Sequence, residues 1–179
     1  MTNIFSGLFL IFINFDLTLG NSKIGLFPDF IGYIIMVKGL VEMGGESWTF
    51  MKVKPWAIIM AVYTGILYFI ELFGISESLG AIYVILSLAS VVISLYISYT
   101  IVVGVEEVEL KYRTDLNVYS LRFTWKILAV FEIAAFVAAL LMSMVTIICV
   151  IVTIIAAVYF LVAFNKSKNS YYLMKARLS

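Results

Sequence analysis

One segment constrains the fold more than any other: the forty residues from Trp125 to Phe164 carry only two charges, Lys126 and Glu132. The hydrocarbon core of a bilayer is about 30 Å thick, and a helix needs about 20 residues to cross it. The segment is therefore long enough to cross a membrane twice, and its length and apolarity are not those of a helix in a soluble core. It predicts a multi-pass integral membrane protein.

The composition supports this class and excludes several functions. The 179 residues are 64% hydrophobic and 13% charged, far from the soluble average. A net charge of +1 without a basic patch argues against a nucleic-acid partner, and the expected partner is the lipid bilayer. The sequence lacks histidine, a metal-ligand cluster, a phosphate-binding glycine loop and a nucleophile–base pair. We therefore expect no cofactor, no metal and no enzymatic activity.

The predicted fold class is all-α, a single helical bundle over residues 1–179 with about six transmembrane helices. The first segment has only 16 residues. It is therefore either a short transmembrane helix or a re-entrant segment that enters and leaves the membrane on the same side. Pro28 and Pro55 are expected at the first positions of their helices, where proline is tolerated. The expected segments lie at about 4–19, 27–44, 55–74, 79–104, 125–142 and 144–164.

Positive charges fix the predicted orientation. With six spans and the N-terminus inside, ten basic residues lie on the inner side, whereas the outer connections hold only Lys23. Such a bias indicates an N-in, C-in arrangement. The three tryptophans also fall at the inner boundary, as interfacial anchors do. A re-entrant first segment would instead leave the N-terminus outside. The basic residues are Lys52, Lys54, Lys111, Arg113, Arg122, Lys126, Lys166, Lys168, Lys175 and Arg177, and the tryptophans are Trp48, Trp56 and Trp125.

The longest polar stretch, at about 105–124, is predicted to be a cytoplasmic amphipathic connection. Its apolar residues recur at helical spacing, and Glu107–Lys111 and Glu109–Arg113 are spaced as i, i+4 ion pairs. We expect this connection to lie against the membrane or a partner, the alternative being a solvated charged face. The tail at 165–179 is short and basic, which favours anionic lipid.

Polar residues inside the predicted spans are the candidate site. Glu132 is costly to place in a membrane, so it is either a proton- or cation-coupled site or a structural acid bonded to a neighbouring helix. Serines in the fourth span and hydroxyl residues in the sixth follow helical spacing. Such stripes either pack helices together or line a polar pathway, and packing is favoured. Gly32 and Gly39 have the same interpretation. The stripes are Ser87, Ser90, Ser94 and Ser98, and Thr146, Cys149 and Thr153.

The outer side carries an acidic turn formed by Asn14, Asp16, Asp29 and Glu71. Such a rim attracts cations. Asp16 and Asp29 form the alternative of a carboxylate pair suited to an aspartyl intramembrane peptidase, in which one acid is protonated and the other activates water. The plain alternative is that Asp29 caps its helix and the other acids are solvated.

Residues 12–40, FINFDLTLGNSKIGLFPDFIGYIIMVKGL, resemble the opening of small multi-pass membrane proteins of Gram-positive bacteria. The P-D-F-I-G-Y core and the trailing G-L carry the likeness. The resemblance implies a bacterial plasma-membrane location and an outer turn around residues 14–29. It implies no particular activity.

These observations leave a leading hypothesis and two alternatives. The first is a non-enzymatic membrane subunit, scaffold or sensor that packs against a membrane-protein partner or forms a homo-oligomer. The second is a small proton- or cation-coupled transporter or channel that uses Glu132. The third and most remote is the peptidase with Asp16 and Asp29.

Overall fold

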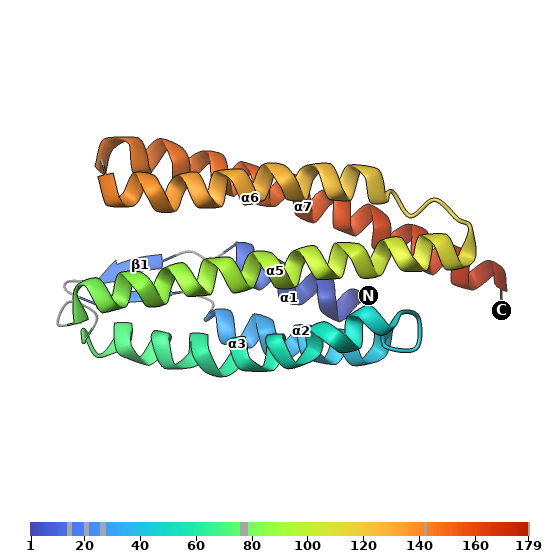
Figure 1. Ribbon diagram of the computed structural model, residues 1–179, viewed down its shortest axis with the longest axis horizontal. Coiled ribbons are helices and arrows are strands. Elements are labelled where there is room, and N and C mark those ends of the chain that lie inside the picture. Colours follow the sequence, from blue (N-terminus) through green and yellow to red (C-terminus); the bar gives the residue numbers. More distant parts are fainter. Residues whose placement is uncertain (14–15, 20–21, 26–27, 76–78, 142, 179) are drawn as a thin grey trace.

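The computed structural model describes residues 1–13, 16–19, 22–25, 28–75, 79–141 and 143–178, and within these it is an all-α bundle (Figure 1). A short antiparallel hairpin, in which Asp16 pairs with Gly25, joins the first two helices. The helices are α1 (Thr2–Phe12), α2 (Asp29–Met43), α3 (Trp48–Leu72), α5 (Ala81–Tyr112), α6 (Val118–Leu141) and α7 (Ser143–Leu178), and the strands are β1 (Asp16–Leu19) and β2 (Ser22–Gly25).

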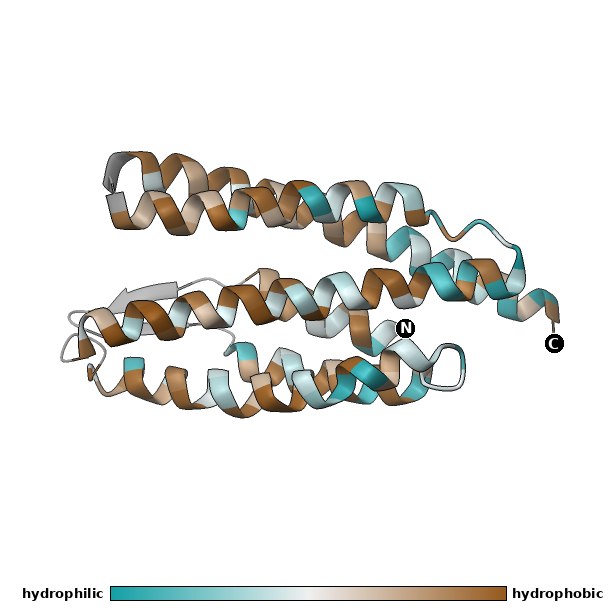
Figure 2. Cartoon of the chain, viewed as in Figure 1, coloured by the Kyte–Doolittle hydropathy of each residue, from teal (hydrophilic) through white to brown (hydrophobic). Residues whose placement is uncertain are grey.

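The connections alternate between two ends of the bundle. Both termini lie at one end, together with the α2–α3 and α5–α6 turns, whereas the β1–β2 hairpin and the α6–α7 turn lie at the other (Figure 1). Hydrophilic residues gather at the end that holds the termini (Figure 2). We call this the inner end, following the orientation that the positive charges predict. The predicted N-in, C-in arrangement agrees with this alternation.

Four of the described helices, α3, α5, α6 and α7, are long and apolar enough to cross a membrane. The α1 helix has 11 residues, about 16 Å at 1.5 Å per residue, and α2 has 15, about 22 Å. Neither alone matches a hydrocarbon core of about 30 Å. The first expected span, 4–19, is therefore correct in being short but wrong in its extent, because its last residues form β1.

Other boundaries also differ from the prediction. The α3 helix begins at Trp48, and Pro55 lies inside it. The Ser47 side chain accepts a hydrogen bond from the Thr49 backbone N–H at 3.1 Å, and this cap starts the helix before the proline is reached. The α7 helix also continues beyond the expected span, into the basic tail as far as Leu178.

The connection predicted at 105–124 is mostly helical and packs within the chain. Val105, Val108 and Leu116 are fully buried in the bundle core. The predicted i, i+4 ion pairs do not form, because other partners take the two acids. Glu107 accepts a hydrogen bond from the Thr49 hydroxyl of α3 at 2.8 Å, and Glu109 accepts one from the Leu116 backbone N–H in the α5–α6 turn at 2.7 Å. The amphipathic face of this connection therefore belongs to the fold itself.

Glycines let the backbones of α1 and α2 approach each other closely. A Cβ atom added at Gly32 would lie 2.9 Å from the Gly7 carbonyl oxygen. One added at Gly39 would lie 2.5 Å from the Ile4 backbone nitrogen. The predicted packing role of Gly32 and Gly39 is therefore confirmed, since small residues are what close helix contacts in membranes require.

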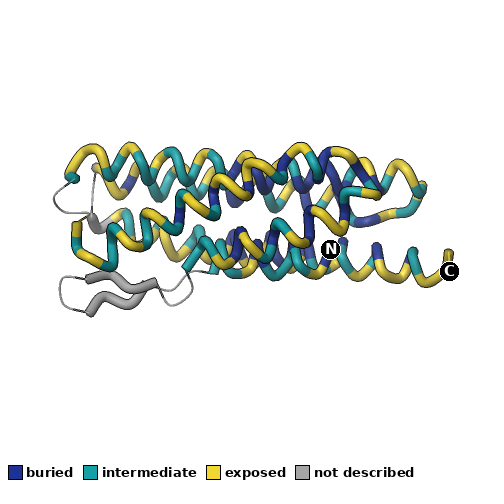
Figure 3. The backbone as a smooth tube through the Cα atoms, turned by 90° about the horizontal axis from the view of Figure 1, so that it is seen from below, coloured by how far each residue is buried: buried dark blue, intermediate teal, exposed yellow. Residues whose placement is uncertain are grey.

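Burial is concentrated in the inner half of the bundle (Figure 3). The buried residues of α3 lie between Thr49 and Thr64, and those of α5 lie between Leu95 and Val108. The inner half thus has a continuous core, whereas the outer half has few fully buried side chains.

A valine at Gly39 should destabilise the α1–α2 pair, because its side chain would overlap the α1 backbone. Overpacking of this kind costs about 1–3 kcal/mol, which would lower the midpoint of thermal unfolding in detergent. Gly45→Ala is the matched control, since an added Cβ there meets nothing within 4 Å. Equal midpoints for the two variants would contradict the close packing.

Cysteine labelling should reveal the orientation. In a Cys149→Ser background, a membrane-impermeant maleimide added to intact cells should label Ile75→Cys, at the outer end. Gly45→Cys, at the inner end, should react only after permeabilisation. Ile75 is exposed in the fold, so its cysteine is accessible to the reagent. The reverse pattern would invert the topology.

Candidate functional site

Two adjacent cavities lie between the helices in the outer half of the bundle. The larger, about 230 Å³, lies between α2, α3 and α5, and the smaller, about 120 Å³, lies between α1, α2, α5 and α6. Asp29, Ser90 and Val91 line both. The two cavities therefore form one polar region, which we call the outer cavity.

An acid and a tyrosine that bond to each other line the part of the outer cavity nearest the outer end. The Tyr83 hydroxyl on α5 donates a hydrogen bond to the Glu71 carboxylate on α3. Ser87 also lines this part, with its hydroxyl bonded to the Tyr83 carbonyl of its own helix at 3.0 Å. The predicted outer acids Asp29 and Glu71 are thus brought together in one cavity lining.

The deeper part of the outer cavity contains Glu132. Around it lie Tyr33 on α2, which is 1% exposed, and Ser94 on α5. Asp29 interacts electrostatically with Glu132. Glu132 thus faces other helices, as expected for an intramembrane acid, and it shares its cavity with a second carboxylate.

The predicted serine stripe serves two purposes. Ser87, Ser90 and Ser94 line the outer cavity, whereas Ser98 is buried in a helix contact. There the Trp125 indole N–H of α6 donates a hydrogen bond to the Ser98 hydroxyl at 2.9 Å. Ser98 therefore contacts a neighbouring helix, while the other three serines border a cavity.

The hydroxyl stripe of α7 contributes mainly to packing. The Thr153 hydroxyl donates to the Phe131 carbonyl of α6 at 3.0 Å and to the Cys149 carbonyl of its own helix at 2.9 Å. Thr146 is half-buried and lines neither cavity. Asn14 and the side chain of Asp16 lie outside the described residues. The predicted pair of Asp16 and Asp29 is therefore not tested.

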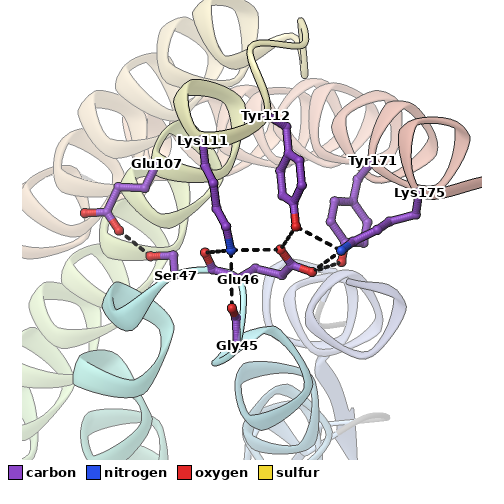
Figure 4. A network of polar contacts seen from close by, with 8 residues as sticks. All are labelled: Gly45, Glu46, Ser47, Glu107, Lys111, Tyr112, Tyr171 and Lys175. Carbon is purple, nitrogen blue, oxygen red and sulfur yellow. Dashed lines mark hydrogen bonds and ion pairs between the residues drawn. The ribbon is translucent and has the colours of Figure 1, made fainter. Parts of the chain in front are cut away.

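A second polar cluster, which sequence reasoning missed, lies at the inner end around Glu46 (Figure 4). The Glu46 carboxylate accepts hydrogen bonds from the Tyr112 hydroxyl at 2.7 Å and the Tyr171 hydroxyl at 3.0 Å. It also pairs with the ammonium groups of Lys175 at 2.6 Å and Lys111 at 3.5 Å. We call these five residues the Glu46 cluster.

The Glu46 cluster changes the acid–base properties of its members. Partial burial alone would raise the pKa of Glu46, but hydrogen bonds from Lys175, Tyr112 and Tyr171 outweigh it and lower this pKa to about 2. The hydrogen bond to Glu46 in turn raises the pKa of Lys175. Both groups are therefore charged at neutral pH.

Further contacts close the inner end. The Lys111 ammonium also donates to the carbonyls of Gly45 at 3.4 Å and Glu46 at 3.2 Å. The N-terminal ammonium of Met1 donates to the Tyr172 hydroxyl of α7 at 3.4 Å. The α2–α3 turn, the end of α5 and the tail of α7 are thus tied together, and the N-terminus is tied to the same tail.

Fold and sites together define a multi-pass helical membrane protein with an acidic outer cavity and a packed inner end. Comparison of the chain with protein-family models, curated proteins and solved structures finds no match. Among the described residues, no group of three His, Cys, Asp or Glu side chains is placed to hold a metal ion. The function must therefore be argued from the cavity and the cluster.

Replacing Glu46 by glutamine should destabilise the protein at neutral pH, because the Lys175 and Lys111 ammonium groups lose their carboxylate. Hydrogen bonds to a charged group at a partly exposed site are worth about 1–2 kcal/mol. For a chain of this size we expect a thermal midpoint in detergent lower by about 2–4 °C per kcal/mol.

The difference should depend on pH in one direction. Because the pKa of Glu46 is lowered from 4.5 to about 2, its stabilising effect is complete above about pH 4.5 and is lost as the pH falls towards 2. The wild-type and Glu46→Gln midpoints should converge over that range. Glu42→Gln, an exposed acid that accepts a hydrogen bond from Asn3, is the control and should change little. A pH-independent difference would contradict the ionic role of Glu46.

Proposed function

We propose that this chain is a small proton- or cation-coupled transporter of a bacterial plasma membrane. The observation that carries the proposal is the lining of the outer cavity. Three acids, Glu71, Asp29 and Glu132, line it from near the outer end of α3 to the interior of α6. Among the described residues, the two linings include no lysine or arginine.

Electrostatics favours a cationic occupant. An ionised carboxylate within a membrane costs several kcal/mol unless it is paired or protonated. Here three acids share one cavity, and like charges at close range raise that cost further. A proton or a cation in the cavity offsets the cost, and an exchange between the two at Glu132 would couple their movements.

The inner half supports a carrier rather than an open channel. Below the cavity, the core is filled by large side chains such as Phe50 and Phe160, both with 0% exposure. The Glu46 cluster then joins the helices at the inner end (Figure 4). The cavity therefore ends inside the bundle. Transport requires a second conformation in which the inner helix ends separate, as in alternating access.

The hypothesis of a partner-binding subunit has less support than it had from the sequence. It relied on small-residue stripes left free for another protein. Ser98 and Thr153 instead bond to helices of this chain, and the glycines of α2 pack against α1. The hypothesis stays a proposal, and crosslinking in native membranes tests it.

Proton or cation flux should depend on Glu132. In proteoliposomes that enclose a pH-sensitive dye, the wild-type protein should move protons against an imposed cation gradient. Glu132→Gln should abolish this flux, because the amide neither holds a proton for exchange nor attracts a cation. Asp115→Asn, in the α5–α6 turn at the inner end, is the matched acid-to-amide control and should keep wild-type flux.

Two outcomes would count against the transporter. If vesicles with the wild-type protein show no flux under any cation gradient, the transporter proposal is wrong. Equal flux in the wild type and Glu132→Gln would show that ions cross by a route that does not use the outer cavity.

A further inference from the structure

We infer that the outer cavity binds a small organic ammonium ion, with aromatic side chains contacting the cation and acids balancing its charge. The inference rests on the proposed function and names the substrate class of the same site. The observation behind it is the part of the cavity lining that is not acidic.

Aromatic and aliphatic side chains surround the acids. Tyr68 and Tyr83 line the larger part of the cavity, and Phe12 and Tyr33 line the smaller part. A cation over the face of an aromatic ring is attracted to it, and the attraction is stronger when both are removed from water. Proteins recognise quaternary ammonium groups with such rings. An acidic cavity with several rings therefore suits an alkylated ammonium group.

An inorganic ion fits this lining less well. A dehydrated Ca²⁺ requires six to eight oxygen ligands around one point, and Mg²⁺ requires near-octahedral geometry. The described residues contain no group of three acids arranged for a metal ion. Leu67 and Val91 in the lining also provide apolar contact, which an organic cation uses and a hydrated ion does not.

Size limits the ligand to a small molecule. The two parts of the cavity measure about 230 and 120 Å³. Pockets for drug-sized ligands are about 300–1,000 Å³, so each part is below that range. A compact amine with a few carbon atoms fits the larger part, close to Glu71 and Asp29.

Tyr68 is the ring best fixed for this contact. Its ring makes edge contacts with Phe30 of α2 and with its chain neighbour Phe69, and in both pairs the ring centroids are 5.9 Å apart. Tyr83 is instead held by its hydroxyl, which bonds to Glu71. A ring that is already fixed loses little side-chain entropy on binding, so the entropic cost of binding is small.

The test uses tetramethylammonium as the probe, with the purified full-length protein in detergent and radiolabelled ligand. Wild type should bind the probe saturably, and an excess of Na⁺ or K⁺ at equal ionic strength should not displace it. Tyr68→Leu removes the ring but keeps an apolar side chain, and it should weaken binding by about threefold to thirtyfold, the range expected for a cation–π contact.

Two controls separate loss of the ring from loss of the fold. Tyr68→Phe keeps the ring and should bind the probe within about twofold of wild type, because the π-face is unchanged. Tyr159→Leu removes an exposed tyrosine on α7 and should bind normally. Both leucine variants should keep the wild-type thermal midpoint within a few degrees.

The outcomes distinguish this inference from the proposed function. Proton flux that depends on Glu132, without tetramethylammonium binding or with equal competition by Na⁺, would overturn the inference and leave the transporter. Saturable binding that weakens in Tyr68→Leu, without flux in vesicles, would support the inference and remove the transporter. Equal probe binding by Tyr68→Leu and wild type would overturn the aromatic contact.

Discussion

The closure of the bundle depends on the carboxylate of Glu46. It lies in the turn between α2 and α3, yet its partners come from the end of α5 and the tail of α7 (Figure 4). The strength of these contacts comes from charge, because hydrogen bonds to an ionised group are stronger than neutral ones. Since the inner ends of these helices meet at one acid, their separation would require all of its bonds to break together.

The two halves of the bundle differ in how they are packed. In the inner half, the absence of a side chain at Gly104 admits the Phe50 ring, which a Cβ atom there would approach within 2.8 Å. In the outer half, Ser90 and Ser94 line a cavity between helices. The bundle thus combines a packed inner core with a polar cavity in its outer half.

Part of the site could be predicted from the sequence and part could not. Glu132 was identifiable because a charge in an apolar run is costly wherever its helix packs. Glu46 was not, because it lies in a polar turn and its bond to Tyr171 joins residues 125 positions apart. Likewise, the i, i+4 pairing predicted for Glu107 was wrong, since spacing along one helix does not reveal that Ser47 and Thr49 of another segment provide better partners.

The sequence by itself determined that this is a membrane protein and roughly where its helices lie, and it predicts which end faces inwards. These properties depend on hydropathy and charge summed along the chain, so they hold before any helix packs. Only the tertiary structure decided that Asp29, Glu71 and Glu132 line one outer cavity, that Ser98 bonds to Trp125 while Ser94 lines the cavity, and that Pro55 lies within a helix. Those outcomes depend on which side chains from distant segments come into contact, and that is set by the packing geometry of the whole bundle.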